Sequence, residues 1–131
     1  MIVLDTHALI WWVSEPGKLS AKARRLIRSA AAREEIIAST ISTFEIVTLV
    51  RRERLQLNVD IDRWLAALQA IPEFRFQPIT IEIARVAAAF DSKFPGDPAD
   101  RFVAATARVV GAQLVSADRR IRAAAVVETV W

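Results

Sequence analysis

The sequence predicts an α/β fold in which helices cover both faces of a mostly parallel sheet of four to five strands. Three observations lead to this prediction. Short apolar segments typical of buried strands alternate with longer segments of helical periodicity along the whole chain. Residues that favour helix starts and turns lie where these segments meet. Glycine and proline are scarce, at three and five of 131 residues, so the connecting loops should be short.

The first half of the chain is expected to hold two strands, each followed by two helices. The apolar run from Ile2 to Leu4 ends at Asp5 and is typical of a buried strand. Pro16-Gly17 should end the first helix, and Ser20 is suited to cap the second. In order, the expected elements are a strand over 2–4, a helix over 6–13, a helix that begins after Ser20, a strand over 35–38, and helices over 42–53 and 60–70.

The second half should add three helices and the remaining strands. Asp97-Pro98 has the residues favoured at a helix start, and Gly111 is well placed to end the same helix. In order, the expected elements are a strand over 74–79 that Pro78 brings to an end, helices over 80–91 and 97–110, a strand over 113–116, a short helix over 118–124, and a strand over 126–130.

Length and composition are those of one globular domain over residues 1–131. Hydrophobic residues make up 53% and charged residues 25%, which is not the composition of a disordered chain. We see no basic leader and no apolar run long enough to span a bilayer, so we expect a cytoplasmic protein without a membrane segment. The net charge of +3 permits a nucleic-acid partner without establishing one.

Cysteine and histidine usage limits the possible chemistry. The absence of cysteine excludes thiol nucleophiles, thiolate metal sites and disulfides, and it is compatible with a reducing cytosol. His7 is the single histidine, so neither a histidine-rich metal site nor a Ser-His-Asp triad is credible. A metal site must therefore depend on oxygen ligands, which favours Mg²⁺ or Mn²⁺ over Zn²⁺.

Four acidic residues are expected to meet at one edge of the sheet. Asp5 and Asp118 lie at or just past the ends of expected strands, whereas Glu45 and Asp100 lie in the first turns of helices. Sites in parallel α/β folds form beyond the carboxyl ends of the strands. Carboxylates held close together repel one another unless a dication joins them, and Mg²⁺ takes such ligands. A metal so held can activate water and stabilise the charge that develops on a phosphate.

Helix capping offers a second explanation for each acid taken singly. Asp5 and Asp118 are both placed to cap the helix that follows them. Ser42-x-x-Glu45 has the pattern of a capping box, with Glu45 reaching back to the helix start. Asp97 is an ideal cap for the helix that contains Asp100. Capping does not predict that so many acids lie at the same end of one sheet, and the two roles are compatible.

Four segments of the sequence carry a recognisable pattern: "MIVLDTHALIWW" (1–12), "STISTFEI" (39–46), "DPADRFVAATA" (97–107) and "LVSAD" (114–118). In their order and spacing they resemble PIN-domain proteins, and most of all the VapC-like ribonuclease toxins of bacterial type II toxin–antitoxin pairs. The resemblance covers nearly the whole chain. It implies a three-layer α/β/α sandwich, a homodimer, an RNA substrate and a small cognate antitoxin that blocks the site.

The resemblance also implies a role for each acid. Asp5 and Asp100 would be the principal Mg²⁺ ligands, with Mn²⁺ as a substitute. Asp118 would help to hold the metal directly or through water, and Glu45 would ligate the metal or orient the attacking water. Ser116 matches a hydroxyl position near the site and would contact metal, water or phosphate. Asp97 belongs to the variant of the motif seen here, and we expect it to cap its helix rather than to bind metal.

Basic side chains near the acids are candidates for contact with RNA. Arg119 and Arg120 directly follow Asp118, so we expect one of them to contact a substrate phosphate. Arg101 flanks Asp100, and we expect it to pair with a neighbouring acid.

Three aromatic or imidazole side chains lie on the first expected helix. Trp11 and Trp12 are adjacent, so they cannot both face the core, and one of them is expected to pack inside while the other marks a partner surface. Base stacking is the less favoured alternative for them. His7 stands where many relatives carry a small polar residue, and we expect it to pack or to form hydrogen bonds at the helix start rather than to bind metal.

Three other functions compete with that of a metal-dependent endoribonuclease toxin. A related DNA nuclease would need the same carboxylates, so sequence does not separate it from a ribonuclease. A non-catalytic module that only binds RNA or protein would be expected to lack at least one acid, and none is missing. A phosphorylated receiver domain would need a lysine late in the chain, and the last lysine is Lys93.

Overall fold

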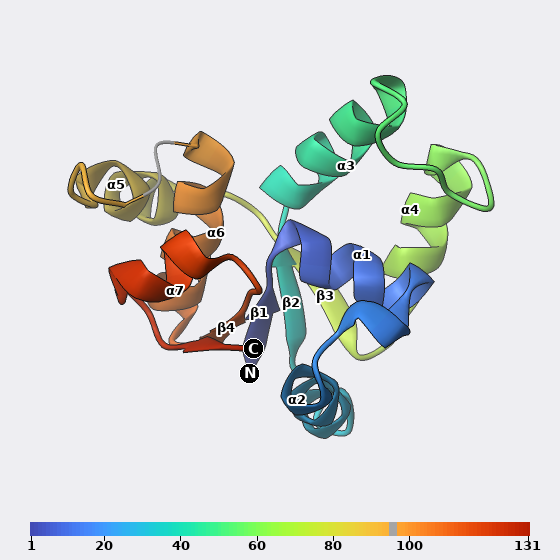
Figure 1. Ribbon diagram of the computed structural model, residues 1–131, viewed down its shortest axis with the longest axis horizontal. Helices are drawn as coiled ribbons and strands as arrows, with labels where there is room; N and C mark the ends of the chain where they lie inside the picture. The colour runs from blue at the N-terminus through green and yellow to red at the C-terminus, as the bar shows by residue number, and fades with distance from the viewer. Residues whose placement is uncertain (95–96) are drawn as a thin grey trace.

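The protein is described by a computed structural model that covers residues 1–94 and 97–131. Its strands form one sheet in the order β3-β2-β1-β4-β5, and every neighbouring pair is parallel (Figure 1). The predicted mostly parallel sheet of four to five strands is therefore confirmed. The strands are β1 (Ile2–Leu4), β2 (Ile36–Ser39), β3 (Phe74–Gln77), β4 (Gln113–Val115) and β5 (Thr129–Val130).

Helices connect the strands and cover the sheet. The expected ranges hold to within a few residues, apart from the last strand, which is two residues long instead of five. The helices are α1 (Thr6–Ser14), α2 (Ala21–Ala31), α3 (Ile41–Arg51), α4 (Ile61–Gln69), α5 (Ile81–Ala89), α6 (Pro98–Val110) and α7 (Arg119–Ala124), with a 3₁₀ turn at Pro16–Lys18. None of the helices over residues 1–94 and 97–131 is long and apolar enough to cross a membrane.

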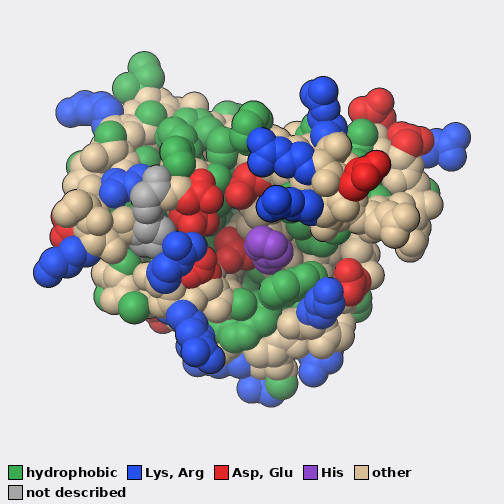
Figure 2. All heavy atoms as spheres, turned by 45° about the horizontal axis from the view of Figure 1, so that its top comes forward, with side chains coloured by type: hydrophobic (Ala, Val, Ile, Leu, Met, Phe, Trp, Pro, Cys, Tyr) green, Lys and Arg blue, Asp and Glu red, His purple; other side chains and the backbone are tan. Residues whose placement is uncertain are grey.

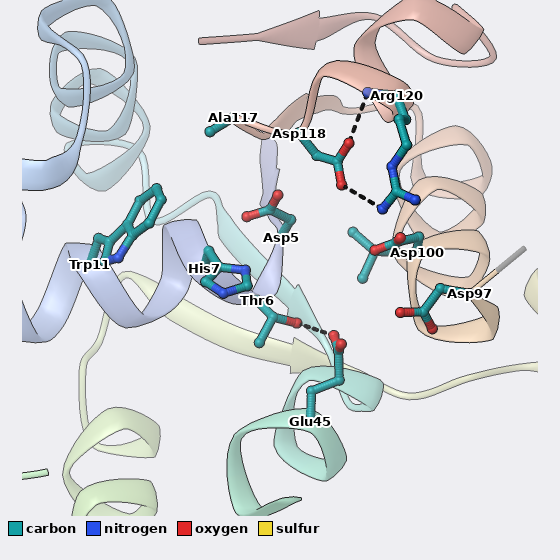
Figure 3. Close-up of a pocket in the computed structure, with 11 residues that line it drawn as sticks. Asp5, Thr6, His7, Trp11, Glu45, Asp97, Asp100, Ala117, Asp118 and Arg120 are labelled. Carbon is teal, nitrogen blue, oxygen red and sulfur yellow. Dashed lines mark hydrogen bonds and ion pairs between the residues drawn. The ribbon is translucent and has the colours of Figure 1, made fainter. Parts of the chain in front are cut away.

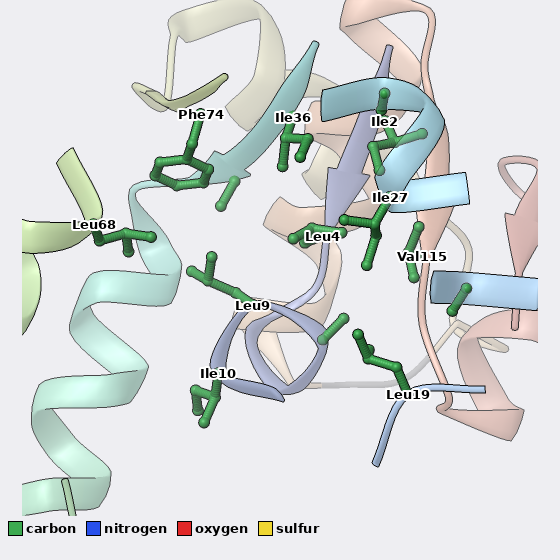
Figure 4. Packing of buried hydrophobic residues seen from close by; sticks show 14 of the residues in the cluster. Ile2, Leu4, Leu9, Ile10, Leu19, Ile27, Ile36, Leu68, Phe74 and Val115 are labelled. Atoms are coloured by element: carbon green, nitrogen blue, oxygen red, sulfur yellow. The ribbon is translucent and has the colours of Figure 1, made fainter. Parts of the chain in front are cut away.

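Two hydrophobic clusters lie on opposite faces of the sheet. Ile2 and Leu4 of β1 face one cluster, which α1 to α4 cover (Figure 4). Val3 faces the other cluster, which α5 to α7 cover. All three side chains are at most 2% exposed, because successive residues of a strand point to opposite faces and both faces are covered. Each buried side chain of this size contributes about 1.5–3 kcal/mol to folding. The result is the predicted α/β/α sandwich.

Local sequence accounts for most helix ends. The side chains of Ser20 and Thr80 accept hydrogen bonds from backbone amides three residues ahead and so cap α2 and α5. Gly111 ends α6 with φ +72°, a left-handed conformation that glycine adopts without strain. Pro98 occupies the first turn of the same helix, where its missing N–H costs nothing.

Arg101 joins α6 to the end of α5, and the expectation that it pairs with an acid is wrong. Its guanidinium donates to the carbonyl oxygens of Ala87, Phe90 and Asp91 at 3.1, 2.9 and 2.9 Å. These carbonyls lie at the C-terminal end of α5, where the helix itself supplies no donors. A basic side chain from the next helix therefore satisfies them.

The sheet register brings the strand ends together at one edge. Leu4 lies beside Ala38 on one side and beside Val115 on the other. The amide of Asp5 continues this ladder by donating to the carbonyl of Val115 at 3.1 Å. The residues that follow β1, β2 and β4 consequently share the carboxyl edge of the sheet, as predicted for the acidic residues.

Candidate active site: an acidic cavity at the carboxyl edge of the sheet

An acidic cavity of about 430 Å³ opens at this edge (Figure 3). All four acids singled out from the sequence line it. Figure 2 shows acidic side chains gathered in a hollow near the middle of this face, with Lys and Arg side chains on either side. The lining residues are Asp5, Glu45, Asp97, Asp100 and Asp118, together with Thr6, His7, Trp11, Val103, Ala117 and Arg120.

Asp5 caps α1 and lines the cavity at the same time. It follows β1 directly, and its Oδ1 accepts a hydrogen bond of 2.8 Å from the amide of Ala8. Burial raises the pKa of its carboxyl, and this effect outweighs the hydrogen bonds from Ser116 and Ala8. The capping explanation is thus confirmed for Asp5, and it fixes the direction in which the carboxylate points.

Glu45 does not form the capping box with Ser42 that its spacing suggested. The hydroxyl of Thr6 donates to Glu45, and Ser42 instead forms a 2.9 Å hydrogen bond with the same hydroxyl. Thr6 and Ser42 are both buried, so this pair connects the start of α1 to α3. Burial is the main cause that raises the pKa of Glu45, and the charge of Asp97 adds to it. A contact between distant helices therefore holds Glu45 at the cavity.

Asp97 and Asp100 lie on the first turn of α6 and repel each other. Asp97 caps the helix as predicted, since its Oδ1 accepts a 3.0 Å hydrogen bond from the amide of Ala99. Asp100 is half-buried, and burial together with the charges of Asp97, Asp118 and Glu45 raises its pKa to about 7. This cavity holds more negative charge than its own cations offset.

The pKa of Asp118 shifts in the opposite direction to that of Asp100. Its Oδ1 caps α7 through the amides of Arg120 and Ile121 at 2.8 and 3.4 Å, and its Oδ2 lies 3.5 Å from the Arg120 guanidinium. Burial acts to raise the pKa of Asp118, but these hydrogen bonds and the Arg120 charge together hold it below its usual range. Asp118 is therefore more readily ionised than Asp5, Glu45 and Asp100, whose pKa values are raised.

The three candidates for substrate contact are placed differently. Arg120 lines the cavity, whereas Arg119 is exposed and is not among the residues that line it. Ser116 is fully buried and accepts a 3.1 Å hydrogen bond from the amide of Asp118. Its hydroxyl also lies near Asp5 and lowers the pKa of that carboxyl. Ser116 thus lies beneath the site beside two acids, and it has no exposed surface for contact with RNA.

Among the lining residues that were not assigned to the site from the sequence are two with rings, His7 and Trp11. His7 is exposed in the first turn of α1 and packs against Trp11, with ring centroids 5.7 Å apart. That His7 does not bind metal stays a prediction. Trp12, by contrast, packs on the other side of α1, 5.9 Å from Phe74. The four-residue spacing of His7 and Trp11, which places them on one helix face, was the available signal.

The donor set has the chemistry of a magnesium or manganese site. In this conformation the carboxylates line the walls of the cavity, and no three acidic or imidazole groups among residues 1–94 and 97–131 are close enough to hold a metal ion. The acids nevertheless offer only oxygen donors, and their mutual repulsion, which adds to burial in raising the pKa of Asp100, is what a dication would relieve. The residues therefore fit a hard divalent cation if their side chains converge.

Comparison with known proteins places the chain beside PIN-domain proteins. The family model for the PIN domain matches residues 2–127. "Ribonuclease VapC22" from Mycobacterium tuberculosis is 41% identical over 121 residues, which are 92% of this chain and 89% of that protein.

Two solved structures share the fold along nearly the whole chain. A structure of VapBC2 from Rickettsia felis bound to a DNA fragment from their promoter matches with a TM-score of 0.74 at 13% identity, over 99% of this chain and 98% of that one. A toxin–antitoxin complex from Klebsiella pneumoniae matches with a TM-score of 0.67 at 18% identity, over 100% and 97% of the two chains. At these identities the two structures support the fold alone.

Proposed function

Since the chain belongs to the PIN-domain family, we propose that it is a divalent-metal-dependent endoribonuclease and the toxin of a toxin–antitoxin pair. The observation that carries the proposal is the convergence of four predicted acids on one cavity. The 41% identity to a protein named as a ribonuclease supports RNA as the substrate. We place this activity in the cytoplasm.

The acidic side chains have distinct roles in this proposal. Asp5 and Asp100 are the principal ligands of Mg²⁺, for which Mn²⁺ can substitute, and Asp118 helps to hold the ion. Glu45 ligates the metal or orients the attacking water, and its hydrogen bond from Thr6 holds it for that task. When bound, the ion supplies activation of water and stabilisation of the charge on the phosphate. Asp97 contributes negative charge beside Asp100 while it caps α6.

Arg120 is the proposed contact to the substrate phosphate. It lines the cavity, and its guanidinium lies 3.5 Å from Asp118. A cation at Asp118 would compete for that carboxylate, which leaves Arg120 free to bind an anion. Arg119, equally charged but outside the cavity, is its natural control.

The proposed partners are a small antitoxin and a second copy of the chain. The antitoxin is proposed because four segments of the sequence resemble VapC-like toxins, a resemblance that implies a small antitoxin. If a small open reading frame adjoins the gene, its co-expression with the chain, followed by purification, should yield a complex without ribonuclease activity. Light scattering on the isolated chain should give the mass of a homodimer, and a monomer mass would overturn that part of the proposal.

The decisive experiment compares cleavage of a mixed RNA pool and of DNA with Mg²⁺, with Mn²⁺ and with EDTA. The wild type should cleave RNA internally with either metal and should not cleave with EDTA. Asp5→Asn and Asp100→Asn should lose activity by about 100-fold or more, since even residues that only orient metal ligands alter affinity or activity about 10–100-fold. Asp62→Asn, an exposed aspartate in the first turn of α4, should cleave like the wild type.

The remaining outcomes separate the rival functions. Cleavage of DNA in preference to RNA would replace the ribonuclease with a DNA nuclease. Binding of RNA with no cleavage by the folded, metal-loaded and antitoxin-free protein would favour a non-catalytic module. Cleavage that Asp5→Asn and Asp100→Asn leave intact would refute the role of the carboxylates.

A further inference from the structure

We propose that His7 and Trp11 form a stacking platform for an unpaired nucleobase of the RNA, next to the phosphodiester that the acids act on. The proposal deepens the ribonuclease function and rests on it. It assigns a base-binding role to two residues of the cavity that the carboxylate chemistry does not use. The term base platform refers below to these two side chains.

The base platform belongs to the same cavity as the carboxylates. His7 and Trp11 both line it, and Figure 3 shows the His7 ring between Trp11 and the acids. They are four residues apart on α1 and so lie on one face of the helix. A substrate whose phosphate reaches Asp5 and Asp100 therefore has aromatic surface within the same hollow.

The hydrophobic core accounts for only part of this aromatic pair. The buried side of α1 consists of Thr6, Ala8, Leu9 and Ile10. Trp11 is half-buried and packs partly against the hydrophobic cluster on this face of the sheet, whereas His7 is exposed. The imidazole of His7 contacts the ring of Trp11 and lines the cavity.

The geometry of the rings leaves aromatic surface available. The ring planes of His7 and Trp11 are tilted by 48° with centroids 5.7 Å apart, so neither ring covers the face of the other. Trp131 also packs against Trp11, with ring centroids 5.6 Å apart and ring planes tilted by 53°. Trp11 is thus a fixed aromatic surface rather than a mobile side chain.

An unpaired nucleobase is the ligand that this arrangement suits. Proteins that bind single-stranded nucleic acid pair a charged track for the backbone with aromatic side chains on which bases stack. Here Arg120 supplies a cation in the cavity, and the base platform supplies the aromatic surface. Double-stranded RNA keeps its bases stacked on one another, so the proposal specifies a single-stranded segment at the site.

The test measures binding without cleavage. All variants carry Asp100→Asn, and the probes are a fluorescein-labelled single-stranded RNA decamer and inorganic polyphosphate, which has phosphates but no bases. Trp11→Leu should raise the Kd for the RNA about tenfold, within the range that one stacked base contributes, and leave that for polyphosphate unchanged. Trp11→Phe should retain most of the affinity because it keeps an aromatic face, and His7→Ala should give a smaller loss.

Trp12→Leu is the matched control, because it makes the same change on the other side of α1. It should leave the RNA affinity unchanged, and thermal melting of each variant shows that the fold survives. Unchanged RNA affinity in Trp11→Leu, or an equal loss for RNA and polyphosphate, would overturn the proposal. A loss of antitoxin binding with RNA binding intact would overturn it as well, because the surface would then be a protein interface.

The base platform and the nuclease activity can fail separately. If the wild type cleaves RNA and Trp11→Leu binds RNA normally, the nuclease stands and the platform is refuted. If the wild type does not cleave but the loss in Trp11→Leu is specific to RNA, the platform stands as part of a binding module.

Discussion

Replacement of Asp100 by asparagine should stabilise the metal-free protein at alkaline pH, although it removes a residue of the site. Burial and the charges of Asp97, Asp118 and Glu45 raise the pKa of Asp100 to about 7, from 3.8. The folded state therefore keeps this proton between pH 3.8 and about 7, whereas the unfolded chain releases it. Because the native state then binds more protons than the unfolded state, the free energy of unfolding falls as pH rises through this window.

The size of the effect follows from the same shift. Each pH unit in this range lowers the free energy of unfolding by about 1.4 kcal/mol, so the whole range lowers it by about 4 kcal/mol. Asp100 is half-buried, and water screens part of the repulsion, which leaves an expected gain of about 2 kcal/mol for Asp100→Asn at pH 8. At pH 5 the wild type has lost less than half of this free energy, so the gain in stability from Asp100→Asn should be less than half as large.

Urea denaturation in EDTA at pH 5 and pH 8 measures this gain. Asp62→Asn is the control, because it removes an aspartate from the first turn of another helix without touching the cavity. It should cost about 0.3–1 kcal/mol at both pH values through the lost interaction with the helix dipole. The reasoning would be refuted if Asp100→Asn behaved like this control or if its effect did not depend on pH. Added Mn²⁺ should then stabilise the wild type and not Asp100→Asn, a readout of metal binding that is independent of cleavage.

Three further substitutions test the fold and the electrostatics. Asp97→Asn keeps a side chain that can cap α6 but removes its charge, so the pKa of Asp100 should fall, as a ¹³C NMR titration of the carboxyl can show. Gly111→Ala should cost about 1 kcal/mol in urea denaturation because of the φ of +72°, whereas Gly17→Ala, also with open space around the new Cβ, should be nearly neutral. Arg101→Met should cost about 2–3 kcal/mol in the same assay, since it leaves three carbonyl oxygens of the α5 end without their donor, and a cost below 0.5 kcal/mol would contradict that role.

Sequence alone determined the features that depend on near neighbours along the chain. The apolar run of β1 and the short β-to-α connections determined a parallel sheet covered on both faces. Asp5, Asp97 and Asp118 were identifiable as helix caps because each accepts a hydrogen bond from an amide two or three residues ahead. Strand ends in a parallel sheet share one edge, and for that reason the meeting of the acids could also be predicted.

Only the tertiary structure decided the interactions between distant segments. Glu45 receives its hydrogen bond from Thr6, which is 39 residues away, and no local pattern distinguishes this partner from Ser42. Arg120 rather than Arg119 enters the cavity because the short helix α7 turns one of two equal side chains toward it. The pKa of Asp100 depends partly on charges that two other segments, α3 and α7, bring near it. Each of these is a distance between side chains on separate elements, and such distances exist only once the sheet order and the helix packing are established.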